Sequence, residues 1–393
     1  MPQPPAPRES SRLRPVFRAF LVLLVVTAIE TLSCASLHLM EWRAPGSVVE
    51  IFLANHFAKR VSTAKKEKGV RRVFDRDLGW VARPGYEKTS TAGDDRQWTY
   101  STNESGARSG PGNEGTLLVT TYGDSFTAGV EVQNDETWQT YLAAELGGAV
   151  VNFGIAAYGT LQAVMRMERH LADGYVAPVT ILGIYETNLE RVVNSFRPLL
   201  LPDTGVVLGF KPSHRYRNGR IEFFPSAWTD PDLSLGELKK LARKAAQNDF
   251  YAEQMGNFAF PFSYQVARTV KSRVIESPDK KKLQLWDSVE GRAIMNDLVD
   301  RFAAQARAKG SEPVLLFIPS TATLFRGIPP GYAGFAAEIQ ERRPKMTVID
   351  IAEEEFSRPE FNVAPFRGHP SPYGHRVIAS ALARDIGAFF ADR

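Results

Sequence analysis

From residue 116 onward, short apolar runs alternate with longer segments whose apolar positions recur every three or four residues. The first pattern indicates buried strands and the second indicates helices. Strands are expected at 116–122, 149–153, 179–185, 313–318 and 346–351, and helices at 135–146, 160–173, 285–309, 332–342 and 374–390. Strands that alternate with helices predict an α/β fold, in which helices cover both faces of a mostly parallel sheet.

One region precedes this alternation and another interrupts it. Upstream, 47–66 is helix-like, 96–102 alternates as a strand does, and 103–114 holds the Asn, Gly, Ser and Pro of a loop. After the third strand, a long insertion over 190–284 is rich in proline and aromatic residues, and such excursions shape substrate sites in α/β enzymes. Its aromatic residues either pack a small core of their own or stack on a ligand. They include Phe223, Phe224, Trp228, Phe258, Phe260 and Phe262.

The N-terminal part carries a long apolar segment. Residues 19–40 contain one acidic residue, Glu30, and they follow four arginines within the first 18 residues. A membrane span needs about 20 apolar residues, and arginines before it favour a cytoplasmic N-terminus. The segment therefore predicts a single-pass signal anchor in the inner (cytoplasmic) membrane, with the domain that follows it outside the cytoplasm. The expected order begins with a cytoplasmic basic tail over 1–18, of which 1–14 is disordered, and the anchor over 19–40. A juxtamembrane and lead-in segment over 41–110 and the α/β domain over 111–393 follow.

Other interpretations of this segment stay open. They are a signal peptide cleaved near Ala35, a lipoprotein signal that ends at Cys34, and a buried helix of a soluble protein. A basic stretch over 59–76 begins about 19 residues after the span, near the limit at which charge influences orientation. That stretch is either a solvated helix surface or a segment that rests on anionic lipid.

Composition narrows the possible functions. The net charge is +4 over 393 residues and no basic stripe is interleaved with aromatic residues, so nucleic-acid binding is not expected. Cys34 is the one cysteine, which excludes an intramolecular disulfide. The six histidines are scattered, and no His, Asp or Glu cluster has ligand spacing. Neither a metal nor another cofactor is therefore expected.

The candidate chemistry begins where the first strand ends, at Tyr122-Gly123-Asp124-Ser125-Phe126-Thr127. A serine on a tight turn between a strand and a helix is how many hydrolases present a nucleophilic hydroxyl. The tripeptide Gly123-Asp124-Ser125 is also common in ordinary turns. The interpretation therefore depends on partners elsewhere in the chain.

Three other elements offer such partners. Gly154, in Asn152-Phe153-Gly154, allows a backbone N–H to approach a bound oxygen, and Asn188 at the end of the third strand supplies an amide donor. His369 lies in a Gly/Pro-rich loop before the last helix and is placed to act as a general base. Taken singly, Gly154 and Asn188 are more typical of an ordinary turn and of a helix cap than of a functional site. His375, in the same segment as His369, is expected to cap or pack the final helix.

Together the four elements resemble the SGNH (GDSL-type) hydrolase family, in its membrane-anchored subgroup. Gly123 to Thr127 matches the first block, Asn152-Phe153-Gly154 the second, Gly183 to Asn188 the third and Gly368 to His375 the last. The matched blocks span about 116–385, and the upstream segments Asp75 to Pro84 and Thr102 to Arg108 are also similar to such members.

The resemblance implies a three-layer α/β/α, flavodoxin-like fold. It implies Ser125 as nucleophile, His369 as base, and an oxyanion hole made by the Ser125 N–H, the Gly154 N–H and the Asn188 side chain. Asp124, with Gly123, would brace the turn.

Two departures from the family pattern concern the site. Family members place an aspartate two or three residues before the histidine, whereas Phe366 and Arg367 stand there, and the nearest upstream carboxylate is Glu360. A backbone carbonyl or a distant acid would then have to orient His369. The third block also has extra residues before Asn188, so Glu186 or Asn194 could take its role.

The expected function is a serine esterase, a hydrolase that removes acyl groups such as acetyl from envelope or extracellular glycans or from small esters. One alternative is an O-acyltransferase that modifies an exported polysaccharide. Another is a non-catalytic glycan-binding or assembly protein with a degenerate site.

Overall fold

The computed structural model describes residues 10–39, 70–91, 96–200, 209–255, 260–270, 285–362 and 368–390. Its central sheet has five parallel strands in the spatial order β11-β10-β7-β5-β6. Their bounds are Leu117–Tyr122 for β5, Ala149–Asn152 for β6, Val179–Tyr185 for β7, Glu312–Ile318 for β10 and Thr347–Asp350 for β11. Numbered along the chain, this order is 2-1-3-4-5, the flavodoxin-like doubly wound arrangement. The predicted α/β fold with a parallel sheet is confirmed.

Each strand alternates its side chains between two helical layers. In β7, Ile181 contributes to one buried core while Leu182 and Ile184 contribute to the other, as the period of two in a strand requires. One core also holds side chains of α5 (Thr160–Ala172), α12 (Val289–Ala308) and α14 (Ala333–Arg342). The other holds side chains of α4 (Trp138–Leu146) and α16 (Pro372–Ile386). These helices give the predicted three layers.

The capping residues, more than the apolar pattern, determine where the helices begin. The helix expected over 285–309 is interrupted at Ser288. Residues 285–287 are helical, and α12 begins at Val289, where the Ser288 hydroxyl accepts from the Gly291 N–H at 2.9 Å. The helix expected from 374 begins at Pro372, after the N-cap Ser371. The helix expected over 135–146 is split into a 3₁₀ turn, Asn134–Glu136, and α4.

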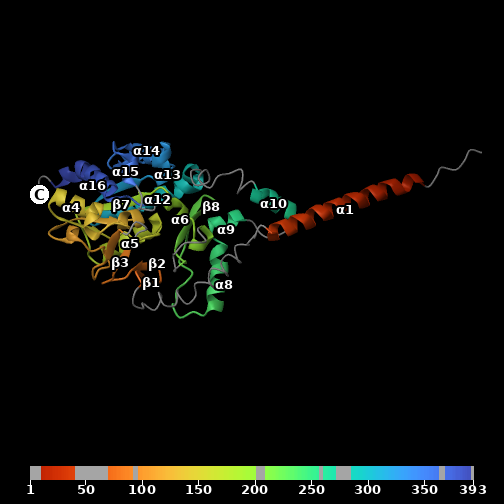
Figure 1. Ribbon diagram of the computed structural model, residues 1–393, viewed down its shortest axis with the longest axis horizontal. Helices are drawn as coiled ribbons and strands as arrows, with labels where there is room; N and C mark the ends of the chain where they lie inside the picture. Colours follow the sequence, from red (N-terminus) through yellow and green to blue (C-terminus); the bar gives the residue numbers. More distant parts are fainter. Residues whose placement is uncertain are drawn as a thin grey trace, which may run out of the picture.

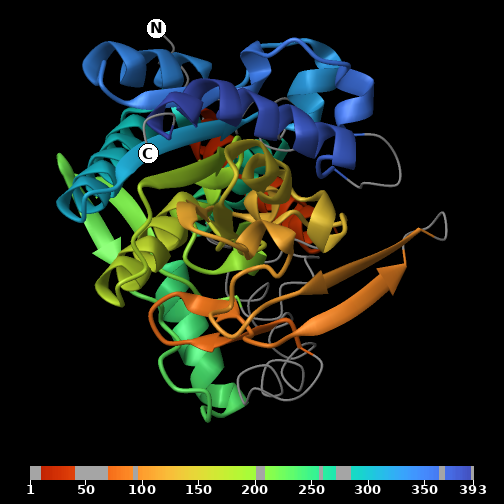
Figure 2. The same ribbon diagram turned by 90° about the vertical axis from the view of Figure 1, so that its left-hand side faces the viewer.

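Two antiparallel hairpins precede the sheet. They pair β1 (Arg72–Asp75) with β2 (Gly79–Ala82), and β3 (Glu87–Thr91) with β4 (Gln97–Ser101), so the strand expected at 96–102 is confirmed. Figure 2 shows these hairpins in orange. The helix-like segment 47–66 and most of the basic stretch 59–76 lie outside the described residues.

The insertion contains its own small elements. These are α6 (Asn188–Val192), α7 (Arg197–Leu200), β8 (Ser213–Arg217), β9 (Arg220–Phe224), α8 (Leu235–Ala246), α9 (Phe250–Met255) and α10 (Phe262–Val270). A third core joins Trp228, Phe196 and Phe210 of the insertion to Trp80 of the second strand. Packing therefore accounts for Trp228, whereas Phe223 and Phe260 are exposed.

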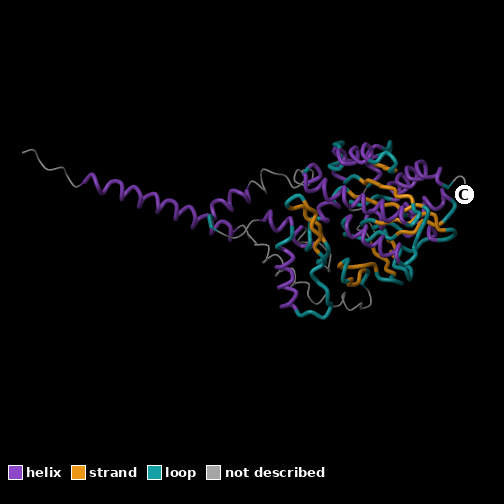
Figure 3. Tube along the Cα trace, turned by 180° about the vertical axis from the view of Figure 1, so that it is seen from behind, coloured by secondary structure: helices purple, strands orange, loops and turns teal. Residues whose placement is uncertain are grey.

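The N-terminal helix α1 (Ser10–Leu39) extends away from the rest of the molecule (Figures 1 and 3). Its segment Pro15–Leu37 is long and apolar enough to cross a membrane, although a signal sequence meets the same criteria. Residues 10–14 belong to the helix, so the expectation of disorder over 1–14 is wrong for these five positions. The helix continues through Pro15, and Ser10 to Arg14 form its N-terminal end ahead of the apolar segment.

Candidate active site

The predicted blocks converge at the carboxyl edge of the sheet. Ser125 follows β5, Gly154 follows β6 and Asn188 follows β7, and these three strands are neighbours. β6 and β7 pair with β5 on opposite sides, so the strand order reverses at β5, which is where open α/β sheets bind their ligands. His369 reaches Ser125 from the loop before α16.

Ser125 begins a short helical turn, α3 (Ser125–Ala128). Asp124 caps this turn, because its Oδ1 accepts from the Phe126 N–H at 2.9 Å. The Ser125 N–H lies in the first turn, where backbone donors have no partner inside the helix. Gly123 is required next to it, since a Cβ there would lie 2.1 Å from Thr127 Oγ1.

The Ser125 hydroxyl faces an imidazole. His369 Nε2 lies 3.0 Å from Ser125 Oγ, and its Nδ1 lies 3.3 Å from Glu131 Oε2. The Phe126 ring packs beside the imidazole with 5.1 Å between centroids. A hydroxyl, an imidazole and a carboxylate thus stand in the order of a Ser-His-acid triad. Phe366 and Arg367 lie outside the described residues.

Glu131 is the functional candidate that sequence reasoning missed. It lies six positions after Ser125 and has a φ of 75°, a left-handed conformation that is uncommon for a residue other than glycine. Such conformations persist where the surrounding structure enforces them, and they gather at functional sites. Neither its spacing nor its residue type predicted contact with a histidine 238 positions later.

Arg108 holds the loop that carries Glu131. Its guanidinium donates to the carbonyl oxygens of Ala128 at 2.8 Å, Gly129 at 2.5 Å and Val132 at 2.7 Å. Arg108 is 3% exposed, and burial lowers its pKa to about 10. Its ion-dipole contacts therefore replace water around the buried charge and fix the backbone on both sides of Glu131.

Two of the three predicted oxyanion donors already bond within the protein. The Gly154 N–H donates to Asn152 Oδ1 at 2.9 Å. The Asn188 Nδ2 donates to Asp124 Oδ2 at 3.0 Å and faces the Tyr158 carbonyl at 3.4 Å. The sequence-predicted residues are therefore brought together, but the donors of Gly154 and Asn188 point to protein acceptors.

Asp124 is the centre of a buried polar cluster. Besides Asn188, its Oδ2 accepts from Arg191 Nη1 at 2.6 Å, and the Asp124 side chain is 1% exposed. Arg191 also donates to the Tyr158 carbonyl at 3.0 Å. Arg191 lies in α6, so this ion pair fastens the start of the insertion to the nucleophile turn. Asp124 thus has the bracing contacts that the resemblance implied.

The alternative residues lie in other networks. Glu186 accepts from the Ser320 N–H at 2.7 Å and the Gly331 N–H at 2.8 Å, which ties β7 to the loops around α13 (Thr321–Arg326). Asn194 donates to Asp249 at 2.8 Å inside the insertion.

His375 is fully buried within α16. Its Nδ1 accepts from the Trp138 N–H at 3.1 Å, and burial lowers its pKa to about 3. The His375 imidazole is therefore neutral, and it acts as a buried hydrogen-bond acceptor that packs in the helix, as expected.

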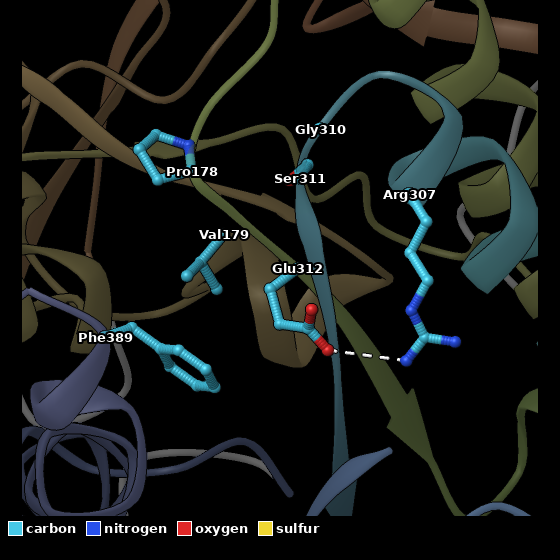
Figure 4. A pocket seen from close by; sticks show the side chains of 7 residues that line it. All are labelled: Pro178, Val179, Arg307, Gly310, Ser311, Glu312 and Phe389. Atoms are coloured by element: carbon cyan, nitrogen blue, oxygen red, sulfur yellow. Dashed lines mark hydrogen bonds and ion pairs between the residues drawn. The ribbon is translucent and has the colours of Figure 1, made fainter. Parts of the chain in front are cut away.

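A surface pocket lies at the other end of the sheet (Figure 4). It is lined by residues at the amino ends of β7 and β10, including Val179 and Glu312, with Phe389 beside them. Arg307 pairs with Glu312 across it at 3.4 Å. The pocket is thus separate from Ser125. Within the described ranges, no group of three or more His, Cys, Asp or Glu residues is placed to hold a metal ion.

Solved structures similar to this chain include three hydrolytic proteins. They are the lipase Lip_vut3 from a goat rumen metagenome (13% identity, 69% of this chain, 97% of that chain, TM-score 0.39), a family 3 carbohydrate esterase from Clostridium thermocellum (11%, 70%, 98%, 0.35) and a member of the lipolytic G-D-S-L family from Veillonella parvula DSM 2008 (10%, 68%, 97%, 0.33). No protein-family model and no curated protein matches the chain.

The resemblance to SGNH hydrolases is confirmed as a resemblance of fold. The strand order and the gathering of the blocks at one sheet edge are those that it implied. At 10–13% sequence identity, with TM-scores of 0.33–0.39, this similarity concerns the fold and not the activity or the substrate.

Proposed function

We propose that this chain is a membrane-anchored serine esterase of the SGNH type. The observation that supports it is the 3.0 Å contact between Ser125 Oγ and His369 Nε2. In this mechanism Oγ attacks the ester carbonyl while Nε2 takes its proton. The imidazolium then protonates the leaving alcohol, and water hydrolyses the acyl-enzyme by the same route in reverse order.

Glu131 is the acid that orients His369. A carboxylate at Nδ1 selects the tautomer in which Nδ1 carries the proton and Nε2 is free to accept one. It also stabilises the imidazolium that forms during attack. The absence of an acid close to His369 in the sequence favours the hypothesis of a degenerate, non-catalytic site. The contact between Glu131 and His369 Nδ1 supplies such an acid from elsewhere in the chain and so argues against that hypothesis.

Charge that develops on the carbonyl oxygen needs donors. The Ser125 N–H is the first donor in this proposal because it belongs to the first turn of α3. The Gly154 N–H and the Asn188 amide remain candidate donors, and each would have to share the hydrogen bond that it now makes. Such bonds often realign only when substrate binds.

The proposed substrate class follows from the position of the active site relative to the membrane. With α1 as an anchor and the basic N-terminal tail inside, the site lies outside the cytoplasm, near the membrane surface. Ester groups available there include the acyl, for example acetyl, groups of envelope and extracellular glycans. The membrane contact in this proposal is made by residues 19–40.

The test uses the full chain purified in detergent. We expect hydrolysis of a short-chain aryl ester, followed by release of the chromophore, and we expect Ser125→Ala to reduce the rate to background. Ser380→Ala, which removes an exposed serine on α16, is the matched control and should retain the parent rate. Unchanged hydrolysis in Ser125→Ala would contradict the assignment of the nucleophile.

A second assay separates the two uses of an acyl-enzyme. The chain is given an acylated donor with labelled acyl groups and a glycan acceptor, and the products are resolved. Labelled free acid supports the esterase, whereas labelled glycan without net hydrolysis identifies an O-acyltransferase. Glycan binding without either product identifies a non-catalytic protein.

A further inference from the structure

Glu30 is an acidic side chain within an otherwise apolar helix. It is the one acidic residue of the segment Pro15–Leu37. Its carboxylate accepts from the Phe262 N–H at 2.5 Å and from the Ser263 N–H at 3.3 Å, and it also accepts from the Ser263 hydroxyl. A carboxylate in a membrane-spanning helix is costly unless it is paired, and such residues are usually functional.

The donors belong to the first turn of α10. Backbone N–H groups at that position have no partner inside their own helix, and they lie at its positive end. Glu30 therefore caps α10 from another helix, and α10 in turn satisfies Glu30. The helices α1 and α10 are packed together (Figure 1).

The position of Glu30 fixes the depth of this contact. Leu37, the end of the candidate span, lies seven positions after Glu30, which is about 10 Å at 1.5 Å per residue. The hydrocarbon core of a bilayer is about 30 Å thick. With the N-terminus inside, Glu30 and the start of α10 would lie in the outer leaflet, about 10 Å from the outer end of the span.

The side chains around α10 suit that depth. Phe260 is 70% exposed and Tyr264 is 60% exposed, next to α1, whose apolar side chains are also exposed. Aromatic side chains are enriched at membrane–water interfaces, and amphipathic helices lie in that plane. The exposed aromatic side chains thus extend the exposed apolar surface of α1.

We propose that α10 lies in the outer leaflet of the bilayer, fastened to α1 by Glu30, and that Phe260 and Tyr264 contact lipid. This inference rests on the proposed membrane anchor. The insertion would then join the membrane to the active site, because it begins with α6, whose Arg191 binds Asp124 beside the nucleophile. An ester-bearing glycan held at the membrane surface would then reach Ser125 by binding along this insertion.

The test measures the depth of single spin labels. The full chain carries Cys34→Ser together with one added cysteine, made by Tyr264→Cys on α10, Val22→Cys on α1 or Ser380→Cys on α16. Each labelled chain is reconstituted in vesicles of phosphatidylcholine and phosphatidylglycerol. Accessibility of the label to oxygen, which concentrates in lipid, is compared with accessibility to a water-soluble nickel chelate.

We expect the ratio of oxygen to nickel accessibility at position 264 to be several-fold above that at position 380 and to approach that at position 22. Adding Glu30→Leu should lower the ratio at position 264, whereas Glu30→Gln, which keeps an acceptor oxygen, should preserve most of it. A lipid-exposed position 22 with a water-exposed position 264 would overturn this inference and leave the anchor standing. Water exposure at both positions would overturn both, while hydrolysis by the same chains reports on the esterase separately.

Discussion

Replacing Glu131 by glutamine tests how the site orients His369. Glu131→Gln keeps the shape of the side chain and removes its charge. A hydrogen bond to a charged group contributes about 1.5–3 kcal/mol, and each ~1.4 kcal/mol is a factor of ten in rate. The expected loss in kcat is therefore about 10- to 100-fold, with little change in KM.

This loss is smaller than the roughly 10⁴-fold loss when a serine protease loses its buried aspartate. The Glu131 side chain is 20% exposed and its contact to His369 Nδ1 is 3.3 Å, so water can replace part of it. Steady-state hydrolysis of an aryl ester measures the effect, with Glu114→Gln, an exposed glutamate, as the matched control.

The left-handed backbone at Glu131 allows a sharper version of this experiment. That conformation costs a residue with a Cβ roughly 1–2 kcal/mol, which glycine avoids. Glu131→Gly should therefore unfold no more easily than the parent in a denaturant titration, yet lose at least as much activity as Glu131→Gln. Parent-like kcat in both variants, or a loss of activity that follows a loss of stability, would refute the orienting role.

Three further predictions concern stability. Arg108→Met leaves buried carbonyls without a donor, so it should lower the free energy of unfolding by about 3 kcal/mol or more in a urea titration. Gly154→Ala would place a Cβ 2.4 Å from a main-chain nitrogen and should cost about 1–3 kcal/mol, whereas Gly387→Ala, which meets nothing within 4 Å, should cost much less. The pKa of His375 is lowered from 6.5 to about 3, so the unfolded chain binds the extra proton between these values. Stability should therefore fall as the pH drops from about 6.5 to 3, by at most about 1.4 kcal/mol per pH unit for this group, and more gently in His375→Gln.

The apolar pattern predicted the sheet because each buried strand has a short, continuous apolar run. Val179–Tyr185 occurs where it was expected, and the strand order follows from such α/β units. Boundaries were less predictable, since capping side chains such as Ser288 decide where a helix starts. The fate of the insertion's aromatic residues also depended on packing that periodicity does not report.

The site was predictable only where its residues follow a strand directly. Ser125 and Gly154 are placed by the ends of β5 and β6, so the order of elements brings them together. Glu131 is placed by a loop conformation that Arg108 enforces, and no local pattern encodes that contact. The Asn188 amide donates to Asp124 and to the Tyr158 carbonyl, and pattern analysis considered Asp124 only as a brace.

The central claim is that Ser125 is a nucleophile activated by His369. It is tested most directly by treating the full chain with a fluorophosphonate probe and locating the adduct by mass spectrometry. We expect one adduct on the peptide that contains Ser125, with labelling strongly reduced in His369→Ala and absent in Ser125→Ala. An unmodified Ser125 in a preparation that hydrolyses the aryl ester, or equal labelling in Ser125→Ala, would contradict the account.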